Sequence, residues 1–390
     1  MSVSKNIGLF NECFPPVMDG VSVCVQNYAR WLEQKAGGVS VVTPRNHGVK
    51  YNEDYEVLDY ISVPVPFRKP YVTGIAELDP IFVKNLLLRD FKIVHAHSPF
   101  MSGHLAKHVS TVQRIPMVAT FHSKYRDDFS RVIPGEFAVD QIVKAIVDFY
   151  EKADEVWVPQ ESVKEVLYSY GYKGPVEVVD NGCDLCGDYR DEDFARAREE
   201  LGIGGDEPIL LFVGQHIWEK NTRLVIDTLA LVKDLPFKMF FVGTGYAEDE
   251  MKRLVREAGL SDKVTFTGAL TGREQVARHY AAADLFLFPS LYDNAPLVVR
   301  EAAALHTPSV MVRGATASTV IDDGRNGYLV ENDAAALART LRGLLSDRNA
   351  LRAAGDEASR TIVRSWEDVC DEVLDRYNAL IARKKLIARL

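Results

Sequence analysis

The chain has 390 residues, of which 47% are hydrophobic and 26% are charged, and a formal net charge of −9 at pH 7. This length exceeds one ordinary α/β core and predicts two domains of about 150–200 residues each. The acidic balance argues against nonspecific nucleic-acid binding, which needs a basic surface.

In the first half of the chain, short apolar runs alternate with segments of helical periodicity. Val21–Gln34 carries apolar residues at helical spacing, and such alternation indicates a parallel sheet covered by helices. The runs predict the strands Ile7–Phe10, Val39–Thr43, Ile93–His95, Met117–Thr120, Glu155–Val158 and Val176–Val179.

The charged stretch Asp188–Glu207 ends among glycines and Pro208, which is typical of a linker. A second series of strands is predicted at Ile209–Val213, Met239–Val242, Val264–Thr267, Leu285–Phe288, Ser309–Val312 and Tyr328–Val330. Helical patterns lie between them at Thr222–Leu235, Ala247–Ala258 and Arg273–Ala282. We expect an α/β protein with domains 1–187 and 188–364 and a C-terminal segment 365–390.

The C-terminal segment has an apolar helical stripe followed by a basic tail. The stripe consists of Val369, Val373, Leu374, Tyr377, Leu380 and Ile381. The basic residues from 376 to 390 are Arg376, Arg383, Lys384, Lys385 and Arg389, with no acidic residue among them. Such a tail can bind an anionic membrane surface, or it can be a solvated helix end whose cations favour the negative end of the dipole.

The stretch Phe288–Ala304 has the pattern of a strand, a turn and a helix that opens near Pro296. The first N–H groups of that helix, on Leu297 and Val298, are expected to be free to bind phosphate or sugar oxygens. Two carboxylates flank the helix start. Asp293 and Glu301 could accept hydrogen bonds from a sugar and a ribose diol; alternatively, Asp293 caps the helix and Glu301 pairs with Arg300 or another cation.

Leu211–Asn221 follows the same plan, with a buried strand, a glycine turn at Gly214 and a polar loop that contains Glu219 and Lys220. A lysine at this point can neutralise a diphosphate leaving group. A lone lysine in such a place is more often solvated.

Taken together, the motifs resemble those of a known family. A loop ending Asp19-Gly20 stands where the family has Gly-Gly, and it is followed by the strand end HAHSPF, the segment TFHSKY with His122, and Asn181-Gly182-Cys183-Asp184. The second half carries Gly214-Gln215-x₃-Glu219-Lys220 and Asp293-x₇-Glu301. Six motifs in this order, over nearly the whole length, resemble a family 4 retaining glycosyltransferase with the GT-B fold.

The resemblance implies two Rossmann-like domains with sheets facing across a cleft, and a final helix that crosses back to the N-terminal, acceptor-binding domain. It implies catalytic roles for His122, Lys220 and Asp293. It implies donor contacts from Gly20, Gly214, Gln215, Lys220, Asp293, Asn294, Ala295, Leu297, Val298 and Glu301. Asp19, His97 and Lys124 are the acceptor-side candidates, and one of His95 and His97 is expected to pack in the core.

Two positions depart from the family pattern. Gln215 replaces an arginine that grips the diphosphate, and Asp293 replaces a glutamate that is one methylene longer. Both changes are consistent with an altered preference for the donor sugar or with reduced activity. We interpret them as an altered donor preference because the surrounding motifs are intact.

The subfamily resemblance, in NECFPPVMDGVSVCVQNYARWL, HSPF and TFHSKYRDDF, is to bacterial diacylglycerol α-glucosyltransferases. It implies a hexosyltransferase (EC 2.4.1.-) that moves a hexose from UDP-glucose or UDP-galactose to a lipid such as diacylglycerol or ceramide, giving an α-linked glycolipid. A soluble or polysaccharide acceptor with a UDP- or GDP-sugar is the alternative, and a silent nucleotide-sugar-binding protein is a distant one. A Rossmann dehydrogenase is disfavoured because Asn11–Gly20 lacks G-x-G-x-x-G.

No cofactor and no metal site are expected from the sequence. Cys183 and Cys186 form a C-x-x-C, but a zinc site needs a second pair, and the five cysteines read as reduced thiols. Met1–Phe10 does not resemble a signal peptide. We therefore expect a cytoplasmic enzyme, peripheral at the inner face of the plasma membrane if the tail binds lipid.

Overall fold

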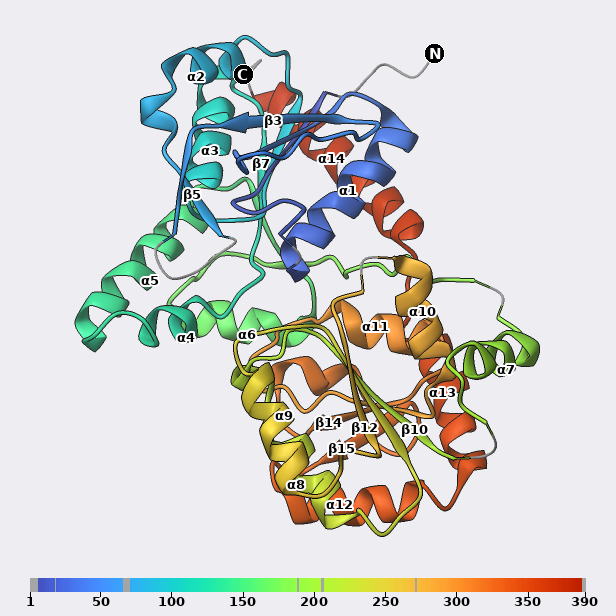
Figure 1. The fold of residues 1–390 in the computed structure, drawn as a ribbon. Helices are drawn as coiled ribbons and strands as arrows, with labels where there is room; N and C mark the ends of the chain where they lie inside the picture. The colour runs from blue at the N-terminus through green and yellow to red at the C-terminus, as the bar shows by residue number, and fades with distance from the viewer. Residues whose placement is uncertain are drawn as a thin grey trace. The chain divides into compact units, whose positions relative to one another are not determined.

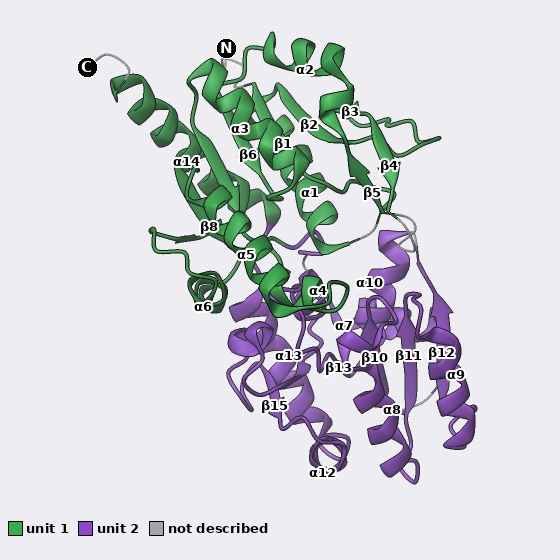
Figure 2. Cartoon of the chain, turned by 90° about the vertical axis from the view of Figure 1, so that its left-hand side faces the viewer, with its two compact units in different colours: residues 1–182, 366–390 green, residues 183–365 purple. Residues whose placement is uncertain are grey.

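The computed structural model describes residues 6–17, 19–65, 71–187, 189–204, 207–270 and 272–387. It divides into two compact units, each an α/β structure (Figures 1 and 2). Unit 1 comprises residues 1–182 and 366–390, and unit 2 comprises residues 183–365. The sequence predicts the first boundary after residue 187, at the start of the predicted linker, whose residues 188, 205 and 206 lie outside the described ranges.

Unit 1 is built on a parallel sheet with the strand order β3-β2-β1-β6-β7-β8-β9, beside which β4 and β5 form an antiparallel pair. Its strands are β1 (Ile7–Phe10), β2 (Val39–Pro44), β3 (Glu56–Tyr60), β4 (Ser62–Pro64), β5 (Val72–Gly74), β6 (Ile93–Ala96), β7 (Met117–Thr120), β8 (Glu155–Val158) and β9 (Glu177–Val178). Its helices are α1 (Gly20–Ala36), η1 (Ala76–Leu78), α2 (Pro80–Leu87), α3 (Met101–Gln113), α4 (Tyr125–Ser130), α5 (Glu136–Tyr150), α6 (Glu161–Ser169) and α14 (Trp366–Ile387).

The last helix, α14, belongs to unit 1 although it follows all of unit 2 in sequence (Figure 2). Its apolar stripe is buried except for Ile381, which is half-buried, and the Tyr377 ring stacks on Trp157 with centroids 5.7 Å apart. The Tyr377 hydroxyl lies 2.6 Å from His95 Nδ1, and Lys35 of α1 pairs with Asp371 at 2.8 Å. The predicted return of the final helix to the N-terminal domain is confirmed.

Unit 2 is built on a parallel sheet with the strand order β12-β11-β10-β13-β14-β15. Its strands are β10 (Ile209–Val213), β11 (Lys238–Val242), β12 (Val264–Gly268), β13 (Leu285–Leu287), β14 (Ser309–Val312) and β15 (Gly327–Val330). Its helices are α7 (Asp191–Glu200), η2 (Trp218–Lys220), α8 (Thr222–Leu231), α9 (Glu248–Glu257), α10 (Arg273–Ala282), α11 (Leu297–Ala304), η3 (Thr316–Val320), α12 (Ala334–Leu344) and α13 (Arg348–Ile362).

Every predicted strand is present, to within one or two residues at its ends. The central strands β1, β6, β7 and β10 are buried at every position, because helices cover both faces of a parallel sheet. Within the described ranges, no helix combines the length and the apolar character required to cross a bilayer.

Candidate active site

In unit 2, the polar residues singled out by the sequence lie at the carboxyl ends of neighbouring strands. Gly214 follows β10, and Asp293 stands between β13 and α11. Since β10 and β13 pair directly and in parallel, their following loops meet at one edge of the sheet. Open parallel sheets bind their ligands at this edge.

Lys220 and Asp293 form an ion pair at that edge. Lys220 Nζ donates to Asp293 Oδ1 at 2.7 Å and to Oδ2 at 2.9 Å, and the two side chains are only 13% and 17% exposed. Ser290 Oγ donates a further hydrogen bond of 2.6 Å to Asp293, and Lys220 Nζ lies 5.3 Å from the centre of the Phe288 ring. Lys220, the predicted phosphate-binding cation, and Asp293, the predicted sugar-binding carboxylate, are therefore each other's ion-pair partners.

Asp293 does not cap the following helix. The N-cap of α11 is Pro296, which makes no side-chain capping bond, so the capping interpretation of Asp293 is wrong. The helix begins at Leu297, one residue later than a proline in the first turn implies. Leu297 and Val298 occupy its first two positions, where backbone N–H groups have no intrahelical acceptor. Asn294 is buried in the preceding turn, and Ala295 beside it is half-buried.

Glu301 is buried within α11 and pairs with residues of the same unit. Arg273 Nη2, on α10, donates to Glu301 Oε1 at 3.0 Å and also contacts Asp184, and the Tyr280 hydroxyl donates to Glu301 Oε2 at 3.0 Å. The alternative in which Glu301 pairs with a cation thus holds, with Arg273 in place of Arg300. Burial raises the pKa of Glu301, while the Arg273 guanidinium opposes that rise.

The loop after β10 is supported by the loop after β11. Gly214 has φ +149°, a conformation that favours glycine, and a Cβ there would lie 3.4 Å from the Lys220 side chain. A Cβ on Gly243 would lie 2.0 Å from the Gly214 carbonyl oxygen, so the two loops touch backbone to backbone. Gln215, which stands at the family's arginine position, is exposed in this arrangement.

In unit 1, three histidines cluster at the carboxyl ends of β6 and β7. His95 is fully buried in the core and its Nε2 lies 2.7 Å from Thr120 Oγ1, as expected for one of the His-x-His pair. His97 Nδ1 lies 3.1 Å from His122 Nε2, and these two rings are stacked at 5.4 Å. Burial lowers the pKa of His122 to about 4 and the pKa of His97 well below its usual range, so both rings are neutral at pH 7.

The loop after β1 carries Asp19 and Gly20. Asp19 is the N-cap of α1 and accepts hydrogen bonds of 2.9 Å from the backbone of Val21 and of Ser22. Gly20 is exposed and has open space where a Cβ would stand. Lys124 is the residue before α4, and its side chain is half-buried. Asp19 is therefore engaged by its own helix, a role that the motif comparison did not predict.

The sequence did not single out the residues that hold these groups in place. Ser290 orients Asp293, and Arg273 with Tyr280 fixes Glu301. In unit 1, the half-buried Glu12 accepts hydrogen bonds from the backbone of Ser102 and of Gly74. Ser290 and Glu12 stand within stretches that the sequence analysis quotes, but nothing in the sequence assigns them these partners. Arg273 and Glu301 are 28 positions apart, and Glu12 and Ser102 are 90 positions apart.

Two α/β units, each with polar residues at the carboxyl edge of a parallel sheet, have the architecture of the GT-B glycosyltransferases. Residues 18–186 match the family described as Glycosyltransferase Family 4, and residues 193–361 match Glycosyl transferases group 1. The chain belongs to the family 4 glycosyltransferases, enzymes that use a nucleotide sugar.

Characterised relatives cover most of the chain. It is 27% identical to the alpha-monoglucosyldiacylglycerol synthase of Streptococcus pneumoniae over 84% of this chain and 76% of that protein. It is 30% identical to the D-inositol 3-phosphate glycosyltransferase of Nocardia farcinica over 75% of this chain and 67% of that protein.

Solved structures share the fold. Sucrose-phosphate synthase from Thermosynechococcus elongatus superimposes with a TM-score of 0.80 at 22% identity, covering 97% of this chain and 99% of that one. Anabaena HepE in complex with UDP-glucose superimposes with a TM-score of 0.76 at 16% identity, covering 96% and 99% of the two chains.

Proposed function

We propose that this chain transfers glucose or galactose from a UDP-sugar to a hydroxyl group of a membrane lipid, such as diacylglycerol or ceramide, with retention of the α configuration. The observation that carries the proposal is the charged array of Lys220, Asp293 and Glu301 at the carboxyl edge of the unit 2 sheet. A diphosphate, a sugar and a ribose present the complementary groups: negative charge for Lys220 and hydroxyl donors for the carboxylates.

In this proposal Lys220 and the first N–H groups of α11 bind the diphosphate. The α11 start and Lys220 together supply a cation and helix N–H groups, the two devices that proteins use for phosphate. Asp293 then accepts hydrogen bonds from sugar hydroxyls instead of from Lys220. Glu301 accepts hydrogen bonds from the ribose diol. His122 acts beside the reacting carbon as a neutral hydrogen-bonding group, since burial lowers its pKa to about 4.

The lipid acceptor is supported by the relatives, of which the alpha-monoglucosyldiacylglycerol synthase of Acholeplasma laidlawii is 23% identical over 97% of this chain and 100% of its own length. To test the proposal, radiolabelled UDP-glucose and UDP-galactose are incubated with the protein and vesicles that contain diacylglycerol or ceramide. A labelled glycolipid is the expected product, and the proton NMR signal of its anomeric hydrogen is expected to show an α linkage. A β linkage contradicts retention.

A soluble acceptor is the second candidate, favoured by the 30% identity to an inositol phosphate glycosyltransferase. The same incubation with inositol phosphates in place of vesicles distinguishes the two. Release of UDP without any transfer product would leave the donor assignment standing and reject both acceptors. Absence of UDP release from every donor would support the catalytically silent alternative.

Membrane binding through the basic tail is part of the proposal, and the structure limits which residues of the tail are available for it. Lys384 pairs with Asp154 at 2.7 Å, and Arg383 lies 3.8 Å from Glu155, so part of the basic tail is engaged within unit 1. Arg389 lies outside the described residues.

Lys385 and the exposed Leu386 and Ile387 remain as the membrane-facing candidates at the end of α14. Lys385→Glu combined with Leu386→Ser is expected to reduce sedimentation with anionic liposomes at low salt, where such attraction is strongest. Lys384→Gln is the matched control, since it removes a cation already paired with Asp154. Equal sedimentation of the wild type and the double variant contradicts the tail's role.

A further inference from the structure

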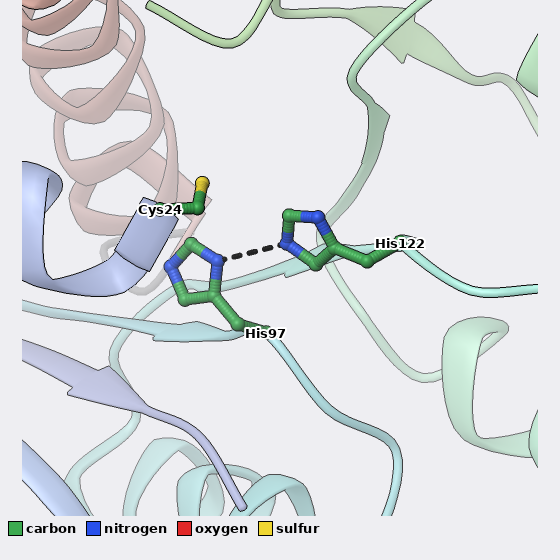
Figure 3. Close-up of side chains that lie close together, drawn as sticks. All are labelled: Cys24, His97 and His122. Carbon is green, nitrogen blue, oxygen red and sulfur yellow. Dashed lines mark hydrogen bonds between the residues drawn. The ribbon is translucent and has the colours of Figure 1, made fainter. Parts of the chain in front are cut away.

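Cys24, His97 and His122 form a cluster at the carboxyl edge of the unit 1 sheet. The Cys24 sulfur and one ring nitrogen from each histidine all lie within 4.8 Å of one another, and no other such group of three occurs in the part of the chain that the structure describes. Figure 3 shows Cys24 of α1 beside the His97 ring, which is hydrogen-bonded to His122. The residues come from α1 and from the loops after β6 and β7.

We propose that this cluster binds a thiophilic divalent metal ion, Zn²⁺ or a similar ion, with a fourth position open to solvent or substrate. Thiolate and imidazole are the ligands that zinc prefers, and the cluster contains no carboxylate of the kind that magnesium and calcium require. Three protein ligands with one open position is a common arrangement for zinc sites that are not structural.

The distances fit a zinc ion with modest adjustment. Bond lengths of about 2.0–2.1 Å to nitrogen and 2.3 Å to sulfur place tetrahedral ligand atoms about 3.3–3.6 Å apart. His97 Nδ1 and His122 Nε2 are already 3.1 Å apart. The widest pair in the cluster, within 4.8 Å, must close by about 1 Å, a change of the size that side-chain rotation supplies.

Binding of a metal ion requires that its ligand atoms lose their protons. The Cys24 thiol, which is 1% exposed and lies 3.5 Å from Asn181 Oδ1, gives up its proton to become a thiolate. The proton between the two imidazoles moves to the other nitrogen of its ring, so one proton is released in total.

The hydrogen bonds around the histidines predict a moderate affinity for the metal ion. The second ring nitrogen of a zinc-bound histidine usually donates to a carboxylate or a carbonyl oxygen. His97 Nε2 is buried and has no hydrogen-bond partner among the described residues. Because this support is missing, we expect binding weaker than that of a structural zinc site, which suits a reversible, inhibitory ion.

The functional consequence rests on the proposed function, in which His122 takes part in transfer. A metal bound to His122 Nε2 ties up that ring, so the ion is expected to inhibit the enzyme. The inhibition should be relieved by a chelator and should depend on Cys24, which has no part in the proposed donor site.

Binding is tested with Co²⁺ alone, which gives a thiolate-to-metal charge-transfer band when a cysteine coordinates it. The wild type is expected to show the band at one equivalent, and Cys24→Ala and Cys24→Ser are expected to lack it. Cys186→Ser is the matched control, because Cys186 is an exposed thiol near Cys183 in unit 2. A band that persists in both folded Cys24 variants, or that disappears in Cys186→Ser, overturns the site.

Inhibition is tested by adding Zn²⁺ during donor turnover, with UDP release as the readout. At least tenfold stronger inhibition of the wild type than of Cys24→Ala is expected, with full recovery after chelation. A cobalt band without this difference overturns the inhibitory role. Absence of UDP release in metal-free buffer counts against the proposed function, while the cobalt band still decides the metal site.

Discussion

The carboxyl edges of the two sheets differ in the charge of their site residues. In unit 2 the site residues are charged and already paired, Lys220 with Asp293 and Glu301 with Arg273. In unit 1 the corresponding edge presents His97 and His122, which burial keeps neutral. A partly buried charge needs a partner at all times, whereas a neutral imidazole does not.

The difference indicates what each edge receives. At the unit 2 edge, a ligand must exchange places with existing ion-pair partners, which favours a ligand as strongly charged as a diphosphate. At the unit 1 edge, a neutral hydroxyl can approach two rings that carry no charge. Substitutions that alter one edge and leave the other intact therefore test most directly whether the two edges bind different ligands.

The largest effect is expected for Lys220→Ala. Loss of the cation that faces a developing diphosphate should lower turnover on the order of 10²–10³-fold. Lys252→Ala is a matched control, since Lys252 also pairs with a carboxylate, Glu248 at 2.6 Å, and lies 5.5 Å from the centre of an aromatic ring. Steady-state UDP release measures both variants. Near-normal turnover in Lys220→Ala is incompatible with the proposed site.

A smaller effect is expected for Asp293→Ala. Loss of a charge-assisted hydrogen bond to the sugar should cost about 1.5–3 kcal/mol, or roughly 10–150-fold in kcat/KM. Asp293→Glu restores the family's residue and should change the preference between UDP-glucose and UDP-galactose. Asp227→Ala, which removes an exposed carboxylate paired with Arg223 in the same unit, is the control. An unchanged preference between the two donors in Asp293→Glu would contradict the interpretation that Asp293 alters donor selection.

Glu301→Gln should affect binding more than turnover. Its carboxylate is expected to hold the ribose diol, so UDP affinity should fall about tenfold, equivalent to ~1.4 kcal/mol. Isothermal titration calorimetry with UDP measures this directly. Glu357→Gln, on a carboxylate paired with Arg325 and Arg360, is the control. Equal affinities in wild type and Glu301→Gln mean that the carboxylate only anchors Arg273 and Tyr280.

The smallest effect concerns unit 1 alone. Tyr377→Phe removes the hydroxyl that bonds His95 but keeps the ring stacked on Trp157. The loss should be about 1 kcal/mol, or about 2–4 °C in the melting temperature of a unit of this size. UDP affinity should not change, because α14 belongs to the other unit. A large loss of UDP binding would contradict the separation of the two edges.

The sequence predicts the strands well because the central strands are short, fully buried apolar runs. It missed β3, whose sequence Glu56–Tyr60 mixes acidic and apolar residues and is only partly buried, and the short pair β4 and β5. It also extended α8 to Leu235, whereas the helix ends at Leu231.

The site residues could be named from motifs, but their partners could not. Lys220 and Asp293 are 73 positions apart, so their ion pair exists only once β10 and β13 are adjacent. Likewise, nothing near Cys24 in the sequence indicates that it lies beside two histidines. Those relations depend on strand order, which periodicity does not encode.

The return of α14 to unit 1 has a consequence for biosynthesis. The strands of unit 1 are synthesised before unit 2, yet the helix that contributes Tyr377 and Trp366 to their core is synthesised after it. Unit 2 is complete before unit 1 is, so it can fold on the nascent chain while the N-terminal sheet still waits for its final covering helix. A premature stop codon just before α14 should therefore destabilise unit 1, although the strands of that unit are synthesised before unit 2.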